Sequence, residues 1–164
     1  MAKRKEEKTN VMRTLEQKRI PYTGYTYPHE EGVAVDGETV AALLGLDAAT
    51  VYKTLVTRGA SGGYYVFDIP VGATLDLKKA ARAVGEKSIA MLPSRELLGL
   101  TGYVHGGCSP VGMKKLFPTV FHQDCLEHPV VVVSAGRIGY QVAVEPRALM
   151  DLVGATAADV VAGP

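Results

Sequence analysis

A glycine-rich segment over residues 101–112 has the residue types best suited to hold a ligand through backbone groups. Four of its twelve residues are glycine, which is tolerated where φ is positive or where the chain must approach another group closely. Ser109-Pro110 fixes one φ angle and removes one N–H donor, so the loop should be tightly turned and stiff. Such a loop suits a ligand held by backbone N–H groups, but a long structural turn between two strands explains the same residues.

A lysine at position 53 lies within a segment whose hydrophobic pattern has a period of two. In a strand, Lys53 shares one face with Val51 and Leu55, while Tyr52 and Val56 lie on the other face. If Val51 and Leu55 face the core, Lys53 faces it too, and a lysine is rarely buried without a partner. If Tyr52 and Val56 mark the core face, Lys53 is solvated. The alternation alone leaves both arrangements open.

Several common reaction centres are missing from the sequence. The histidines lack the paired spacing of a metal site, and the chain has neither a Gly-x-Ser-x-Gly elbow nor a Gly-x-x-x-x-Gly-Lys-Ser/Thr phosphate loop. Cys108 and His105, three residues before it, form the one pair that suggests a thiolate nucleophile. Because cysteine is among the residue types most often buried, a structural role for Cys108 is the stronger interpretation. We expect no cofactor and no metal.

The elements that must position these residues alternate along the chain. Amphipathic spacing, capping residues and glycine stops predict helices over residues 10–20, 40–44, 77–84, 94–98 and 146–153. Residues rich in β-branched and aromatic side chains predict strands over 22–27, 51–58, 64–69, 88–92, 119–122, 130–133 and 140–144. This mixture favours an α/β or α+β domain with a mixed, curved β-sheet.

Length and charge limit the organisation and the partners of the chain. We expect a single domain over residues 1–164, with residues 1–9 as a disordered tail of mixed charge and not a secretory signal. A net charge of +1 lacks the strong positive field of an autonomous nucleic-acid binder, so nucleic-acid contact must be local or assisted by a partner. Two cysteines without a Cys-x-x-Cys motif are typical of a reducing cytoplasm, and no apolar run is long enough to span a membrane.

Four blocks of sequence resemble the YbaK-type or prolyl-tRNA-synthetase-associated editing domains, whose members include Cys-tRNA(Pro) deacylases, and the resemblance extends over about residues 11–161. The blocks are Tyr52-Lys53-Thr54-Leu55-Val56, Leu77-Lys78-Lys79-Ala80-Ala81 with Gly85, Thr101-Gly102-Tyr103 with residues 106–112, and Val133-Ser134-Ala135-Gly136. Their common order and spacing make the resemblance far more specific than any single block. It implies a barrel-like mixed sheet surrounded by helices, and trans-editing hydrolysis of the ester that joins a wrong amino acid to tRNA(Pro).

The resemblance also implies a set of pocket residues. Lys53 matches the pocket lysine of the family, which favours the inward arrangement, and Gly106 is the second residue with an expected catalytic role. Further pocket positions are matched by Tyr27, Thr54 and Ser134, and the matching loop adds Gly107 and Ser109 as substrate-binding candidates.

Two positions depart from the family pattern. Asp36 stands where Cys-tRNA(Pro) deacylases often carry an aromatic residue, and Gln141 stands where some carry an acidic residue. Both would touch the aminoacyl group, so they bear on the preferred amino acid. A carboxylate near the α-amino group would favour Ala or Ser and a water mechanism.

The implied chemistry is that of ester hydrolysis. Lys53 would hold the carbonyl or the terminal sugar-phosphate, and the Gly106-Gly107 backbone would stabilise the oxyanion. Because the set has no paired base and nucleophile, the nucleophile would be an activated water or the thiol of the substrate. The expected partners are the acceptor end of tRNA(Pro) and prolyl-tRNA synthetase, in the cytoplasm. A deacylase for Ala- or Ser-tRNA, a non-catalytic tRNA- or synthetase-binding module and a small-ester hydrolase remain alternatives.

Overall fold

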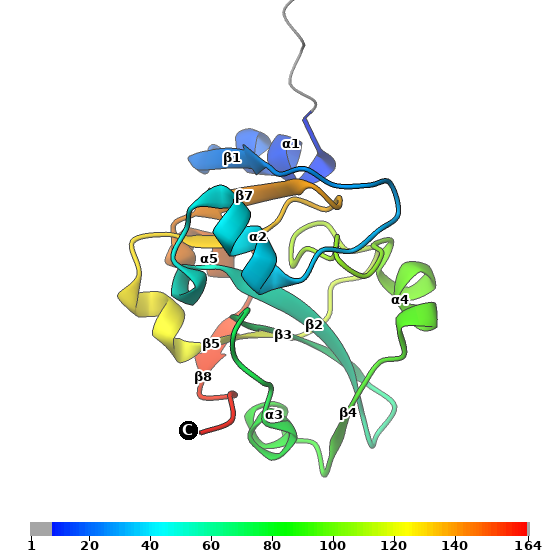
Figure 1. Ribbon diagram of the computed structural model, residues 1–164. Helices are drawn as coiled ribbons and strands as arrows, with labels where there is room; N and C mark the ends of the chain where they lie inside the picture. The colour runs from blue at the N-terminus through cyan, green and yellow to red at the C-terminus, as the bar shows by residue number, and fades with distance from the viewer. Residues whose placement is uncertain (1–7, 164) are drawn as a thin grey trace, which may run out of the picture.

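A computed structural model describes residues 8–163 of the chain (Figure 1). The N-terminal third contains α1 (Asn10–Gln17), β1 (Tyr22–Thr26), α2 (Gly37–Leu44) and the 3₁₀ helix η1 (Ala48–Thr50). The middle contains β2 (Tyr52–Gly59), β3 (Tyr64–Pro70), α3 (Leu77–Val84), β4 (Ile89–Met91) and α4 (Ser94–Thr101). The rest contains β5 (Thr119–His122), η2 (Gln123–Glu127), β6 (Val131–Ser134), β7 (Tyr140–Val144), α5 (Pro146–Val153) and β8 (Thr156–Ala158). None of these helices is long and apolar enough to cross a bilayer.

The strands form two sheets. An antiparallel three-stranded sheet has the order β1-β7-β6, and a mixed five-stranded sheet has the order β4-β2-β3-β5-β8, in which β5 pairs parallel with both β3 and β8. A single parallel bridge between Val51 and Val132 joins the two sheets. The predicted mixture of helices and a mixed sheet is therefore confirmed. The barrel is not closed, because the ladder between β2 and β6 does not extend beyond this bridge.

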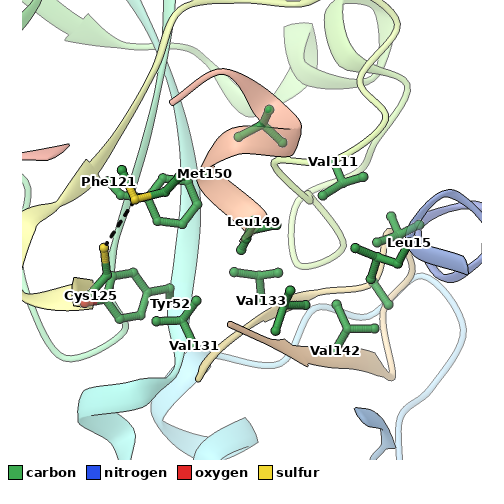
Figure 2. Close-up of a cluster of buried hydrophobic side chains, with 14 of the residues drawn as sticks. Leu15, Tyr52, Val111, Phe121, Cys125, Val131, Val133, Val142, Leu149 and Met150 are labelled. Atoms are coloured by element: carbon green, nitrogen blue, oxygen red, sulfur yellow. Dashed lines mark hydrogen bonds between the residues drawn. The ribbon is translucent and has the colours of Figure 1, made fainter. Parts of the chain in front are cut away.

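The largest core cluster lies where β6 and β7 face α1 and α5 (Figure 2). Leu15, Val133, Val142 and Leu149 are all 0% exposed, and each comes from a different element. Tyr52 enters the same cluster from β2 and donates a hydrogen bond from its hydroxyl to Asp124. This cluster anchors the first residues of β2 against the three-stranded sheet.

Several element boundaries differ from the expectation. Thr9, not Asn10, caps α1, because its hydroxyl accepts the Met12 N–H at 3.2 Å, and Lys8 pairs with Glu16 at 2.7 Å. Of the expected tail over 1–9, residues 1–7 lie outside the described residues. Helix α4 continues to residue 101, where the Thr101 hydroxyl is buried and donates to the Leu97 carbonyl.

Strand β8 was not expected from the sequence. Its residues Thr156, Ala157 and Ala158 are small and carry no alternating pattern, and they become a strand by pairing parallel with β5 at the edge of the sheet. The strand is thus defined by its neighbour and not by its own β propensity.

Candidate active site

A cavity of about 570 Å³ lies between α2, the start of β2, the glycine-rich loop and the adjoining ends of β6 and β7. Seven of the nine predicted site residues line it: Tyr27, Asp36, Lys53, Thr54, Gly106, Ser134 and Gln141. These residues come from segments more than a hundred positions apart, so the fold brings together what the sequence separates. Gly107 and Ser109 do not line this cavity.

Lys53 lies on the cavity wall and is half-buried. Burial lowers the pKa of its ammonium group, and the nearby carboxylate of Glu38 partly opposes that shift. Over residues 8–163, no salt bridge is formed by Lys53. A cation held in this way, without a close carboxylate partner, remains available for an anionic or carbonyl group in the cavity.

The alternation around Lys53 was ambiguous because β2 is covered on both faces. Tyr52 and Val56 are buried on one side, whereas Val51 is buried on the side of Lys53 and Leu55 packs against a second core cluster. Lys53 thus lies on the same face of β2 as two apolar residues, Val51 and Leu55, and all three residues line the cavity.

Asp36 lies at the rim of the cavity as the N-cap of α2. Its carboxylate accepts hydrogen bonds from the Thr39 N–H at 3.0 Å and from the Thr39 hydroxyl at 2.7 Å. These bonds keep the pKa of the Asp36 carboxyl below its usual value. Both carboxylate oxygens therefore serve the first turn of the helix, where a negative charge is also favoured by the helix dipole.

Gly106 brings the glycine-rich loop close to the segment before α2. Its φ is +88°, and a Cβ atom there would lie 2.7 Å from the Cβ of Ala34, so this position requires glycine. Within the described part of the chain, the Gly106 N–H donates no hydrogen bond. The Gly107 N–H, in contrast, donates to the Val104 carbonyl at 3.0 Å. Of the two N–H groups expected to bind the oxyanion, the Gly107 N–H is therefore already used within the loop, and the Gly106 N–H remains as the candidate donor.

Ser109 stabilises the loop instead of facing the cavity. The residue is 0% exposed, and its hydroxyl accepts the Val111 N–H at 3.2 Å. This local turn holds the segment after Cys108 in place, which is a structural role for a residue that the resemblance had included in the pocket.

Two buried polar atoms on the cavity wall have no hydrogen-bond partner in the described residues, the Tyr27 hydroxyl and the Gln141 Oε1. Tyr27 is 4% and Gln141 is 6% exposed. Leaving such a group unsatisfied costs about 1–3 kcal/mol. Nearby, the Ser134 hydroxyl accepts the Gly136 N–H at 3.1 Å, which leaves its own proton to donate. These groups are suited to hydrogen-bond a polar ligand.

Cys108 and His105 also line the cavity. Burial, with a smaller contribution from the charge of Asp68, raises the pKa of the Cys108 thiol to about 12. A thiol with such a pKa stays protonated at neutral pH and is a poor nucleophile. The geometry favours the structural role for Cys108.

The model of the aminoacyl-tRNA editing domain family matches residues 30–152, a span that contains most of the cavity wall. The chain belongs to this family. The editing domain is 42% identical, over 98% of both chains, to an Enterococcus faecalis protein provisionally named Cys-tRNA(Pro)/Cys-tRNA(Cys) deacylase EbsC.

Two further relatives extend the comparison. A solved structure described provisionally as a trans-editing enzyme for prolyl tRNA synthetase has a TM-score of 0.78 and 29% identity, with 93% of this chain and 95% of that chain covered. A proline–tRNA ligase from Fervidobacterium nodosum is 28% identical over 106 residues, which are 58% of this chain but 18% of the ligase. The match thus covers a small part of that enzyme.

Sequence reasoning missed two acidic residues at the site of this editing domain. Glu38 lines the cavity from the first turn of α2, and the negative charge of its carboxylate raises the pKa of Lys53. Asp68 lies behind the cavity wall on β3, where its carboxyl accepts the Thr54 hydroxyl at 2.6 Å. The signal for Asp68 was a carboxyl group inside an otherwise apolar strand, but its partner depends on the β2–β3 register.

Proposed function

We propose that this editing domain hydrolyses the ester bond of mischarged tRNA(Pro), with Cys-tRNA(Pro) as the preferred substrate. The observation that carries the proposal is the cavity itself, which is lined by Lys53, Gly106, Tyr27 and Gln141. Within residues 8–163, the Gly106 N–H, the Tyr27 hydroxyl and the Gln141 Oε1 have no hydrogen-bond partner. The name of the Enterococcus relative, which is similar over nearly its whole length, supports cysteine as the amino acid.

The cavity groups match the parts of an aminoacyl ester. The Lys53 ammonium holds the ester carbonyl or the terminal sugar-phosphate through charge-assisted hydrogen bonds. The Gly106 N–H donates to the carbonyl oxygen as negative charge develops on it. The Gln141 Oε1, an acceptor, receives a proton of the substrate α-ammonium group.

The nucleophile in this proposal is the thiol of the substrate. Its sulfur attacks the ester carbonyl, the bond to the ribose oxygen breaks, and the thiol proton ends on the released 3′-terminal hydroxyl; water then opens the cyclic thioester. Attack within one molecule has an advantage of several kcal/mol, on the order of 7–11 when the groups are well oriented. The high pKa of the Cys108 thiol is consistent with a nucleophile that comes from elsewhere.

Deacylation assays with a panel of charged tRNAs test the proposal. We expect Cys-tRNA(Pro) to be hydrolysed fastest, Ser- and Ala-tRNA(Pro) far more slowly, and Pro-tRNA(Pro) to be spared. Cys-tRNA(Cys) belongs in the panel because the relative's name includes it. Comparable turnover of the Cys, Ser and Ala species would refute the thiol as the nucleophile and indicate an activated water instead. If no species is hydrolysed, the domain is a non-catalytic binding module. If small esters are hydrolysed as fast as the charged tRNAs, the domain is a hydrolase that does not require tRNA.

The proposed partners are the acceptor end of tRNA(Pro) and prolyl-tRNA synthetase, and the proposed location is the cytoplasm. A net charge of +1 suggests few phosphate contacts, hence weak tRNA binding with a shallow salt dependence. Binding of labelled tRNA(Pro) should therefore tighten when the synthetase is added. Tight, strongly salt-dependent binding without the synthetase would contradict this part of the proposal.

A further inference from the structure

Asp68 is a fully buried carboxyl group on β3, directly behind the cavity wall. It is 0% exposed and pairs in register with Thr54 of β2, whose hydroxyl donates to its Oδ1 at 2.6 Å. Its other oxygen, Oδ2, has no hydrogen-bond partner within residues 8–163. A buried carboxyl with a single donor is costly to the fold, so its contact with a cavity residue points to a role in the site.

The surroundings of Asp68 contain no compensating cation among the described residues. The titratable groups that interact with it are Tyr52 on β2, Cys108 in the glycine-rich loop and Cys125 on η2, and the charge of Asp68 contributes to a raised pKa at each. Burial raises the pKa of the Asp68 carboxyl to about 7, although the Thr54 hydrogen bond opposes this shift. The group therefore changes charge near neutral pH.

The protonation of Asp68 decides what Thr54 can offer to the cavity. A hydroxyl has one proton to donate and two lone pairs that accept. An ionised Asp68 can only accept, so it takes the Thr54 proton and leaves the lone pairs of Thr54 for a ligand. A protonated Asp68 can itself donate to Thr54, and the Thr54 proton is then free to turn toward the cavity.

We propose that Asp68 is a positioning residue that holds the Thr54 hydroxyl as a hydrogen-bond acceptor toward the cavity, so that Thr54 selects a substrate group that donates. The donor is the α-ammonium group or the side-chain thiol of the aminoacyl ester. The inference rests on the proposed function and adds to it a determinant of substrate choice that does not itself touch the substrate.

A double-mutant cycle tests the coupling. The variants are Asp68→Asn, Thr54→Val and the double variant, with Thr54→Ser as the matched control that keeps the hydroxyl. We expect Asp68→Asn to raise KM for Cys-tRNA(Pro) about tenfold with little change in kcat, the loss typical of one good hydrogen bond. In the Thr54→Val background the same substitution should change KM less than about twofold. In the Thr54→Ser background, which keeps the hydroxyl, the effect of Asp68→Asn on KM should remain about tenfold.

The pH profile adds a readout that a structural role would not change. Because the acceptor state of Thr54 requires ionised Asp68, this contribution to kcat/KM is present above the Asp68 pKa of about 7 and is lost as the pH falls through it. Asp68→Asn should remove this step while the titration of the substrate itself remains. Alanyl and 3-mercaptopropionyl esters of tRNA(Pro), which lack the thiol and the amine respectively, identify the donor, because the Asp68 dependence disappears with the group that Thr54 binds.

Equal effects of Asp68→Asn in both Thr54 backgrounds, or a lowered melting temperature with unchanged kcat and KM, would overturn the inference. If Asp68→Asn fails to fold, the carboxyl carbon resonance of Asp68 is titrated in the Thr54→Val and Thr54→Ser proteins. Loss of the hydroxyl should raise the pKa of Asp68, and Thr54→Val alone should weaken substrate binding; no change in either would also overturn it.

Binding of 3′-cysteinylamino-3′-deoxyadenosine, which cannot be hydrolysed, separates the inference from the proposed function. Coupled effects of Asp68 and Thr54 on its affinity, without deacylation of any tRNA, would sustain the inference and refute the function. Deacylation of tRNA without coupling between Asp68 and Thr54 would support the proposed function and refute the inference. If neither deacylation nor coupling is found, the function and the inference are both refuted.

Discussion

Two adjacent cross-strand pairs of the three-stranded sheet have opposite surroundings. Val133 of β6 pairs with Val142 of β7, and both are 0% exposed in the cluster of Figure 2. One residue further along, Ser134 pairs with Gln141, and both line the cavity on the other face. One face of these two strands therefore builds the core cluster of Figure 2, and the other face carries both the candidate active site and Val132 and Ala143 of a smaller core cluster.

The difference separates what stabilises the fold from what serves the ligand. Burial of the valines is favourable by roughly 25 cal/mol for each Å² of apolar surface, and their side chains need no partner. Gln141 is almost equally buried, but its Oε1 has no partner in the described structure. The cavity face is thus less stable than it could be, as expected where binding and catalysis use polar groups.

The largest effect is expected for Lys53→Ala, on the cavity side of the comparison. The substitution removes the cation that holds the carbonyl or the sugar-phosphate, so kcat/KM for Cys-tRNA(Pro) should fall by about 100-fold or more. The melting temperature should be unchanged or higher, because a half-buried charge is removed. Lys87→Ala, at an exposed lysine on the same chain, is the control. Near-normal turnover by Lys53→Ala would refute the site.

On the core side, Val142→Ala should lower stability without touching the chemistry. Loss of two buried methyl groups and the resulting cavity cost roughly 2 kcal/mol, which lowers Tm by about 5 °C in a chain of this size. Calorimetry and the deacylase assay are measured on the same preparation. If kcat/KM falls more than stability explains, the two faces of the sheet are not independent.

Gln141→Leu changes the neighbouring position on the other face of the sheet. In contrast to Val142→Ala, it should raise stability and weaken substrate binding. Replacing an amide whose Oε1 has no partner in the described residues by an apolar side chain of similar size should raise the unfolding free energy by about 1 kcal/mol. At the same time KM for the aminoacyl ester should rise about tenfold, since one hydrogen bond to the substrate is lost. Denaturant titration and steady-state kinetics distinguish this from a variant that simply loosens the fold.

The smallest effect is expected for Cys108→Ala, which changes the cavity wall but not the proposed chemistry. Because the pKa of this thiol is raised to about 12, its removal should alter kcat less than about threefold. Single-turnover deacylation of Cys-tRNA(Pro) is the measurement. A loss as large as that of Lys53→Ala would make Cys108 the nucleophile and refute the role of the substrate thiol.

The sequence by itself determined the local structure and the family. Helix α3 begins at its cap Asp76 and ends at Gly85, as its pattern predicted, because capping and a left-handed glycine are decided within a few residues. The strand over residues 140–144 was likewise evident from its own side chains. The family blocks predicted Lys53 and Gly106 as pocket residues, since their neighbours in the chain are distinctive, and both residues line the cavity.

Only the tertiary structure decided where each candidate site residue lies and what it contacts. The direction of Lys53 was ambiguous in a strand covered on both faces, and Asp36 turned out to serve the first turn of α2. The contact between Thr54 and Asp68 depends on the register of β2 and β3, and a shift of one residue would move Asp68 to the opposite face. Such contacts arise between residues distant in the chain, so no local pattern encodes them.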